Sequence, residues 1–175
     1  MPRRRLPEPD FKFETEAEIR SFDLDMMGEA LKLAQEARAL GEVPVGALIV
    51  RGGRILSRGY NLRETLNDPT AHAERIAITR AGRALGSWRL DDCWLYVTLE
   101  PCAMCAGAIV LARPERLIYG ARDPKAGACE SLYQLVTDPR LNHRVRVTTG
   151  VLETECGEIL TRFFQERRSS RKITP

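Results

Sequence analysis

Residues 94–119, WLYVTLEPCAMCAGAIVLARPERLIY, contain the pattern that decides the fold. Trp94 to Leu99 is a short apolar run typical of a buried strand. A helix over Cys102 to Ala112 is entered through Pro101 and stops before the next proline, and Arg116 to Tyr119 is a second strand. Two strands joined through a helix of this length form a parallel pair with a right-handed crossover. The stretch therefore predicts an α/β sheet with helices on both faces.

The sequence on either side supplies further elements. Apolar residues at helical spacing predict a helix that begins after a cap at Asp23 and stops at Gly41. An apolar run over 45–50 and an alternating segment over 54–60, separated by the turn residues Arg51-Gly52-Gly53, predict a hairpin of two strands. The remaining expected elements are a helix over 71–85 capped by Thr70, a short helix over 131–136, a strand over 144–148 and a terminal helix over 153–168. The sheet is therefore expected to have five strands.

Length and composition limit the domain organisation. The 175 residues suit one compact domain, which we expect over residues 23–168. Residues 1–22, rich in Pro, Glu and Arg, are expected to form a disordered arm, and residues 169–175 a basic tail. The longest apolar stretch, 43–50, is shorter than the roughly 18 residues of a membrane helix, so we expect a soluble protein. Because no apolar core follows the basic start of the chain, we predict a cytoplasmic location.

Five cysteines in a chain without an export signal favour metal binding or catalysis over disulfides. Cys102 and Cys105 begin a predicted helix at i, i+3 spacing, which places both sulfurs on one face about 5–6 Å apart. A lone C-x-x-C is compatible with half of a structural zinc site, with a redox pair or with two buried small residues. Cys93, Cys129 and Cys156 are single and far apart, and we expect them to be buried small hydrophobic residues.

His72 and Glu74 lie at the start of another predicted helix. A lone histidine is more often structural than a ligand, but two helix starts can face the same carboxyl end of a sheet. Side chains of a helix lean toward its N-terminus, so His72 and Glu74 can approach one point just beyond it. Together with Cys102 and Cys105, His72 gives three zinc ligands and leaves the fourth tetrahedral position open, as in catalytic zinc sites.

This arrangement predicts a reaction class. Zinc lowers the pKa of bound water from about 15.7 to about 7, so a zinc-bound hydroxide is available at neutral pH. Glu74 is then free to take a proton from that water, give it to a ring nitrogen of an amidine-like base and later protonate departing ammonia. A positioned carboxylate adds about 10²–10⁴-fold to the rate. We predict hydrolytic deamination.

The two motifs also resemble a known family. His72-Ala73-Glu74 and Pro101-Cys102-Ala103-Met104-Cys105 match the H-x-E and P-C-x-x-C pattern of the zinc-dependent nucleobase deaminases. Over residues 24–168 the chain is more particularly similar to the bacterial tRNA-specific adenosine deaminases of the cytidine/deoxycytidylate deaminase superfamily. The stretches that carry this similarity are Glu42–Ala47, Asn61, Asp68–Glu74, Leu95–Cys102, Gly120–Gly127 and Asn142–Val145.

The resemblance implies a three-layer α/β/α cytidine deaminase-like fold around a central mixed five-stranded sheet. It implies a homodimer with one zinc ion per subunit, held by His72, Cys102 and Cys105, and Glu74 as the proton shuttle. The implied activity is the conversion of adenosine to inosine at the wobble position of a tRNA anticodon, chiefly that of the arginine tRNA reading ACG. The dimer rests on the resemblance alone, because the sequence has no periodic apolar seam.

The resemblance also implies substrate contacts. The residues concerned are Asn61 and the backbone near Ala73 for the flipped base, and Asp123, Asn142, Phe164 and Arg167 for the anticodon loop. From the residues alone, the two asparagines are equally compatible with turns. The basic residues Arg162, Arg167, Arg168, Arg171 and Lys172 are compatible with a solvated helix face. Phe163 and Phe164 beside them offer the stacking surface and phosphate contacts that single-stranded RNA requires, which the net charge of +3 allows.

Two rival functions stay open at this point. A guanine or other free-base or nucleoside deaminase would use the same zinc site, although Gly120–Gly127 favours the tRNA enzymes. A non-catalytic zinc-containing RNA-binding module is the rival from another class. Glu74 argues against it, because a structural zinc needs a fourth ligand, and a carboxylate that lies beside an open zinc without binding it suits a catalyst. Two residues depart from the family pattern. Arg75 could form a salt bridge at the surface or alter the rim of the pocket, and Cys129 could place a thiol near the loop that contacts the substrate.

Overall fold

The structure, a computed structural model, describes residues 13–171 and the side chains of residues 13–170. The elements in chain order are α1 (Glu16–Ala39), β1 (Gly46–Arg51), β2 (Arg54–Tyr60), α2 (Arg63–Leu66), α3 (Ala73–Leu85), β3 (Cys93–Leu99), α4 (Ala103–Ala112), β4 (Arg116–Ala121), the 3-10 turn η1 (Leu135–Thr137), β5 (Arg146–Thr149) and α5 (Glu153–Arg171). Within residues 13–171, none of the helices combines the length and the apolar composition that crossing a membrane requires.

The five strands form one mixed sheet in the order β2-β1-β3-β4-β5. The β1 strand is antiparallel to both of its neighbours, whereas β3, β4 and β5 are parallel. The predicted strand-helix-strand unit is confirmed, with Leu95 of β3 beside Leu117 of β4. Because β2, β3 and β4 all run the same way, their carboxyl ends lie together at what we call the carboxyl end of the sheet.

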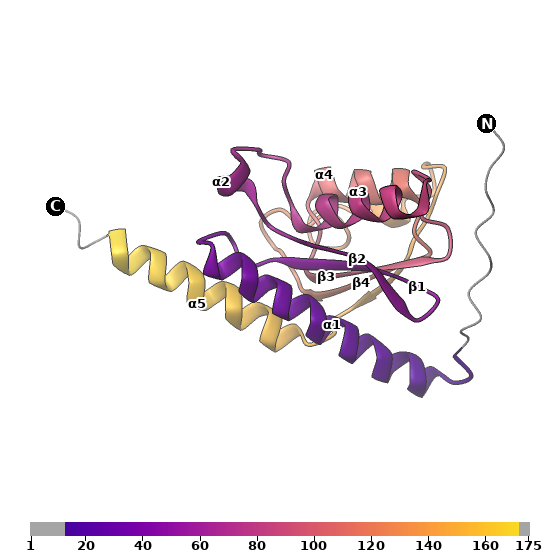
Figure 1. Cartoon of the computed structure of the whole chain (residues 1–175), viewed down its shortest axis with the longest axis horizontal. Helices are drawn as coiled ribbons and strands as arrows, with labels where there is room; N and C mark the ends of the chain where they lie inside the picture. Colours follow the sequence, from indigo (N-terminus) through magenta and orange to yellow (C-terminus); the bar gives the residue numbers. More distant parts are fainter. Residues whose placement is uncertain (1–12, 172–175) are drawn as a thin grey trace.

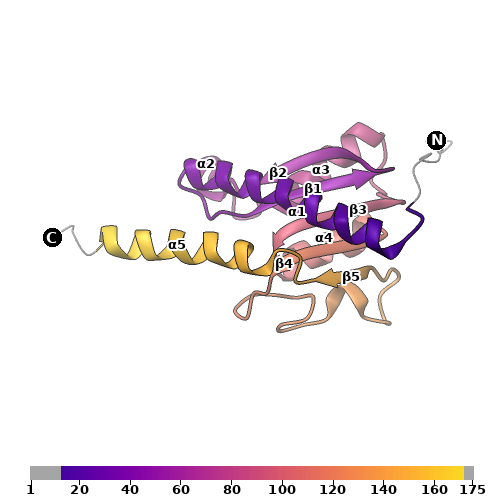
Figure 2. The ribbon, with the colours of Figure 1, turned by 90° about the horizontal axis from the view of Figure 1, so that it is seen from below.

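Helices cover both faces of the sheet, which confirms the three-layer prediction. Figures 1 and 2 show α1 and α5 side by side on one face and α3 and α4 on the other. Alternate residues of each central strand enter the two cores. Leu95 and Leu117 pack under α3 and α4, while Tyr96 and Ile118 pack under α1. This burial on both sides explains why β3 and β4 read as continuous apolar runs.

The first helix begins earlier than predicted. Its N-cap is Thr15, whose hydroxyl accepts the N–H of Glu18 at 3.2 Å while the Glu18 carboxylate accepts the N–H of Thr15 at 3.0 Å, a capping box. Asp23 is therefore no cap; it lies inside α1 and is buried. The predicted arm is accordingly too long, since its last residues are helical, while residues 1–12 lie outside the described part.

Other boundaries differ for local reasons. The second long helix begins after His72 rather than Thr70, because the amide and hydroxyl of Thr70 donate to Asp68 at 2.7 and 2.8 Å. The helix predicted over 131–136 is reduced to the turn η1. The last helix continues to Arg171, so the first part of the predicted tail is helical, and residues 172–175 lie outside the described part.

Candidate active site

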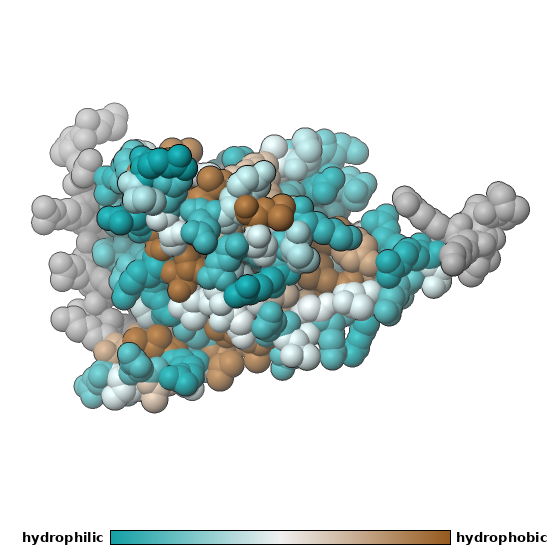
Figure 3. All heavy atoms as spheres, turned by 180° about the vertical axis from the view of Figure 1, so that it is seen from behind, coloured by the Kyte–Doolittle hydropathy of each residue, from teal (hydrophilic) through white to brown (hydrophobic). Residues whose placement is uncertain are grey.

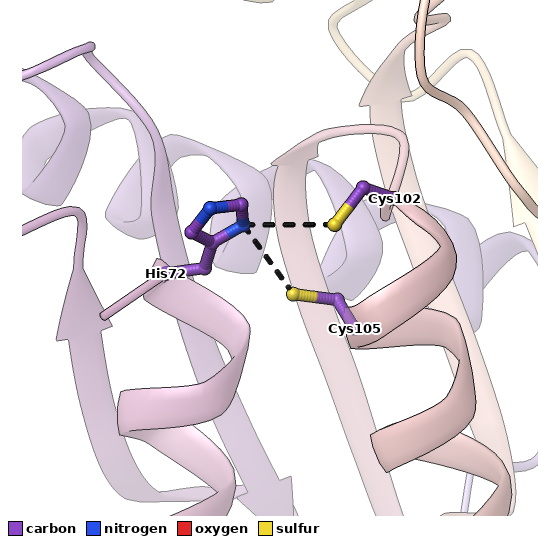
Figure 4. A group of neighbouring side chains, drawn as sticks. All are labelled: His72, Cys102 and Cys105. Atoms are coloured by element: carbon purple, nitrogen blue, oxygen red, sulfur yellow. Dashed lines mark hydrogen bonds between the residues drawn. The ribbon is translucent and has the colours of Figure 1, made fainter. Parts of the chain in front are cut away.

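The N-caps of α3 and α4 bring the predicted metal ligands together. His72 and Cys102 occupy these positions with extended backbone, at ψ 152° and 172°, so their side chains project beyond the helix ends. Both helices start at the carboxyl end of the sheet. As Figure 4 shows, the His72 ring faces the two sulfurs; its Nδ1 lies 3.7 Å from Cys102 Sγ and 3.6 Å from Cys105 Sγ.

These distances test whether the three residues suit zinc. With Zn–N of about 2.0–2.1 Å and Zn–S of about 2.3 Å, tetrahedral geometry separates a nitrogen and a sulfur ligand by about 3.6 Å. The observed separations agree with that value, and all three donor atoms lie within 4.8 Å of one another. One imidazole and two thiolates form a donor set that zinc prefers over magnesium or calcium. His72, Cys102 and Cys105 therefore fit a zinc ion with three protein ligands.

The charges of the triad are strongly coupled. The hydrogen bond from Cys105, followed by that from His72, lowers the pKa of Cys102 to about 3. The hydrogen bond to Cys102 raises the pKa of His72, and the same thiolate together with burial raises the pKa of Cys105. Without metal the triad thus carries a thiolate beside protons that a metal ion would displace, so metal affinity is expected to rise with pH.

Glu74 lies two residues from His72 and is 4% exposed. Burial is the main influence on its carboxyl group and raises its pKa, against the opposing charge of His72. It lines the pocket beside the triad. A raised pKa makes the carboxylate a stronger base, as a group that accepts and passes on a proton requires.

A pocket of about 900 Å³ opens over the triad and includes most of the predicted site residues. Those that line it are Asn61, His72, Glu74, Cys102, Asp123, Phe164 and Arg167. Its walls come from the end of α5 and from the segment that follows β4. In Figure 1, α2 and the outer half of α5 project at this same end of the sheet. Residues far apart in sequence are therefore combined into one site, of a volume suited to a nucleobase and its sugar.

Some predicted contacts lie elsewhere. Ala73 is fully buried beside the strand β2, and contact of its backbone with a base stays a prediction. Asn142 is exposed and lies outside the residues that line the pocket. The neighbouring His143 bonds the carbonyl of Pro114 at 3.0 Å, just before β4 begins, at the opposite end of the sheet. An RNA contact of Asn142 also stays a prediction.

The two phenylalanines of α5 differ in how far their side chains are buried. Phe163 is 4% exposed and packs in the core, whereas Phe164 is 45% exposed and lines the pocket. Their rings meet edge to face at 5.4 Å, and Arg167 lies over the inner ring at 5.5 Å. Only Phe164 can therefore offer a stacking surface to a ligand.

Sequence reasoning missed several pocket residues. The cations that line the pocket are Arg63, Arg122, Lys125, Arg167 and Arg168. Only Arg167 was a predicted contact, and Arg63 comes from α2. Glu100 also lines the pocket although it is 2% exposed; an acidic residue directly after a buried strand was the available signal. Arg75 is exposed away from the pocket and Cys129 is buried, as are the other two single cysteines.

Comparisons with known proteins agree with this site. The pattern of the cytidine and deoxycytidylate deaminase zinc-binding region matches residues 20–121. The tRNA-specific adenosine deaminase of Bacillus subtilis (strain 168) is 51% identical over 146 residues, which cover 83% of this chain and 91% of that protein. A structure solved in a study of A-to-I editing by tRNA:A34 deaminases at the wobble position of transfer RNA is 48% identical with a TM-score of 0.75, covering 78% of this chain and 99% of that one. The guanine deaminase from Nitrosomonas europaea is 25% identical with a TM-score of 0.68, covering 80% and 83%.

Proposed function

The chain belongs to the cytidine and deoxycytidylate deaminase zinc-binding family, and we propose that it deaminates adenosine to inosine at the wobble position of a tRNA anticodon. One observation carries this proposal. The triad of His72, Cys102 and Cys105 meets the buried Glu74 inside a pocket whose walls carry five cations. The 51% identity to a tRNA-specific adenosine deaminase, against 25% to a guanine deaminase, supports tRNA as the substrate.

The chemistry follows from the residues at the base of the pocket. His72, Cys102 and Cys105 would hold one zinc ion per subunit. When bound there, zinc lowers the pKa of a water molecule from about 15.7 to about 7 and so supplies the nucleophile at neutral pH. Glu74 accepts the proton that the water loses and donates it to a ring nitrogen of the adenine. Once the oxygen has added to C6, the same carboxylate would take the second proton from that C6 hydroxyl group and give it to the exocyclic amino group, which leaves as ammonia while the C6 oxygen becomes a carbonyl.

The walls of the pocket suit an RNA loop better than a free base. Asn61 is 5% exposed, and its amide can hydrogen-bond the edge of a flipped base. The five wall cations suit the phosphates of neighbouring nucleotides, and Phe164 suits an unpaired base stacked on its ring. Asp123 and Arg167 would contribute to the same binding surface. A free base has no phosphate for these cations to bind, which favours the tRNA reaction over guanine deamination.

We also propose that the protein is a homodimer that acts in the cytoplasm. The helix α4 contains no polar residue, although its outer side reaches solvent and Leu111 is 69% exposed. In the view from behind, apolar side chains reach the surface among hydrophilic ones (Figure 3). A helix that is apolar all round is normally covered on all sides, and a second copy would cover α4. Light scattering tests this, and Leu111→Glu is expected to give monomers.

One assay tests the activity. Purified zinc-loaded protein should form inosine at the wobble position of an arginine tRNA with the anticodon ACG. Glu74→Ala should keep zinc and RNA binding but lose turnover, whereas Glu29→Ala, on the exposed face of α1, should retain it. Zinc should approach one ion per chain and be lost in Cys102→Ala. Deamination of free guanine but not of tRNA would contradict the proposal, and RNA binding without any deamination would support the non-catalytic module.

A further inference from the structure

We propose that Glu100 is a positioning residue that sets the tRNA-binding wall of the pocket. Its carboxylate holds residues 122–131, which we call the rim loop, against the turn that carries Cys102. The proposal rests on the proposed function, because it concerns how the same pocket binds RNA. It assigns a task to a buried charge that the deamination chemistry does not use.

All five donors to the Glu100 carboxylate come from the rim loop. Oε1 accepts the backbone N–H groups of Cys129, Glu130 and Ser131 at 3.1, 2.8 and 2.9 Å. Oε2 accepts the N–H of Asp123 at 3.0 Å and the hydroxyl of Ser131. A carboxylate has about four lone-pair sites, so this one is fully used. Oε1 binds only residues 129–131, whereas Oε2 binds both Asp123 and Ser131, so the carboxylate joins the two ends of one loop.

The rim loop is closed tightly around this carboxylate. A Cβ atom added at Gly127 would lie 2.4 Å from both Cδ and Oε2 of Glu100, a distance that requires something to move. Gly127 also pairs with Cys102 in an isolated bridge, and the N–H of Ala128 donates to Pro101 at 2.8 Å. The loop and the metal-ligand turn are therefore fixed to each other.

Asp123, whose N–H donates to Oε2, lies at the end of the loop that faces the pocket. Arg122, Asp123 and Lys125 line the pocket. The side chain of Asp123 continues the arrangement, because its Oδ1 accepts the N–H groups of Lys125 and Ala126 at 2.9 and 3.2 Å. The Asp123 N–H bond to Glu100 thus helps to place Lys125, whereas Arg122 also forms an ion pair with Glu130 at 3.1 Å. The donors to Oε1 belong to the other end of the loop, residues 129–131, of which Cys129 is buried.

Glu100→Gln separates these two ends. A glutamine amide has one acceptor oxygen and one donor NH₂ group. With its oxygen toward the three N–H groups of residues 129–131, its NH₂ group faces the N–H of Asp123, and two donors oppose each other. This orientation is favoured because the opposite one loses three backbone N–H bonds instead of one, while the Ser131 hydroxyl can rotate and accept a hydrogen bond from the NH₂ group. The substitution should therefore loosen residues 123–127 of the rim loop and preserve the hydrogen bonds of residues 129–131.

Gly127→Ala perturbs the same contact without removing the charge. Its new methyl group would push the loop away from an intact Glu100 carboxylate. A matched control is Glu29→Gln, which removes one carboxylate from a surface ion pair with Lys32 on α1. Agreement between the Glu100→Gln and Gly127→Ala variants would assign the effect to loop position rather than to lost charge.

The experiment compares wild type and the three variants for zinc content, thermal unfolding, steady-state deamination of the arginine tRNA and RNA affinity at several salt concentrations. For Glu100→Gln and Gly127→Ala we expect unchanged zinc, kcat within about threefold of wild type and KM raised about tenfold, which corresponds to about 1.4 kcal/mol. The dependence of log Kd on log salt should flatten by about 0.7 for each lost phosphate contact. A purely structural defect would lower the active fraction and leave this slope unchanged.

Amide hydrogen exchange provides a readout that is independent of activity. Exchange in Glu100→Gln should accelerate over residues 123–127 and stay slow over residues 129–131. Unchanged exchange over residues 123–127 would overturn the proposal, even if wild type proved inactive on tRNA and the proposed function failed. If wild type is active, a KM and a salt slope that stay at wild-type values would also overturn it, as would loss of zinc in proportion to lost activity.

Discussion

Asp23→Ala should destabilise the protein strongly, because it removes one partner of a buried ion pair. Asp23 Oδ2 lies 2.9 Å from Arg116 Nη2, and the two side chains are only 5% and 10% exposed. The hydroxyl of Tyr96 donates to the same carboxylate at 2.7 Å. Arg116 further donates to the hydroxyl of Thr148 at 2.9 Å and lies 4.4 Å from the ring centre of Trp94. The pair joins α1 to the sheet.

The expected magnitude follows from what remains after the substitution. Removing one partner of a buried pair costs about 3–5 kcal/mol, because the other charge stays buried without compensation. The contacts of Arg116 with Thr148 and Trp94 survive, whereas the buried Tyr96 hydroxyl also loses its acceptor, so we expect a loss of at least about 3 kcal/mol. For a chain of this length that lowers Tm by about 6–12 °C. Replacing both partners, as Asp23→Leu with Arg116→Met, should recover most of the loss, since an apolar pair of similar size is often neutral.

Urea and thermal unfolding of zinc-loaded protein measure this effect, with free zinc held constant because bound metal adds stability. The control is Glu158→Ala, which breaks the exposed pair with Arg162 and should cost less than about 1 kcal/mol. A loss below about 1 kcal/mol in Asp23→Ala, or a double variant no more stable than the single one, would refute the reasoning.

Three further predictions concern the site and its surroundings. Cys102 has a pKa of about 3, so in metal-free protein it should be alkylated first while the three buried single cysteines stay unmodified. Zinc should protect Cys102 from alkylation. Peptide mass spectrometry measures both effects. Burial raises the pKa of Glu42, but hydrogen bonds from Thr65 outweigh it and bring the pKa below its ordinary value of 4.5. The stabilising effect of the Glu42 charge is thus complete above the unfolded pKa and is lost as pH falls through the folded one, so Glu42→Gln should flatten the fall of unfolding free energy below about pH 5. Phe164→Ala should weaken RNA binding by about 1–3 kcal/mol in a titration without changing Tm, whereas Phe163→Ala should cost about 3–5 kcal/mol of stability.

Most of the fold could be predicted because its decisive signals are local. Every strand was expected, β1, β3 and β4 from largely apolar runs and β2 from its alternating pattern, and the pairing of β3 with β4 followed from the short helix between them. The start of α1 could not be predicted in the same way. Asp23 has the side chain of a good cap, and its actual partner, Arg116, lies 93 residues away. A helical pattern gives no information about a partner so distant, so the predicted cap lies eight residues after the observed one, Thr15.

The metal ligands could be predicted because each lies beside a helix start, and helix starts meet where parallel strands end. Phe163 and Phe164 could not be separated, because neighbours on a helix differ in burial only when the tertiary position of the helix is known. The short helix expected over 131–136 failed for a related reason. The N–H groups of Glu130 and Ser131 donate to Glu100, about 30 residues earlier, so local propensity was overridden by one buried carboxylate.

The helix α4 connects the chemistry to the proposed assembly. Its inner side carries Cys105 and the core residues Ala106 and Ile109, all fully buried, while Leu111 lies on its exposed side. Because the ligand spacing requires the first turn of α4 to stay fixed, and because a ten-residue helix is marginal without tertiary packing, whatever covers the outer side also stabilises the zinc site. The proposed second copy would cover that outer side. The position of the two thiolates would then depend on a packing contact that involves neither the metal nor the substrate.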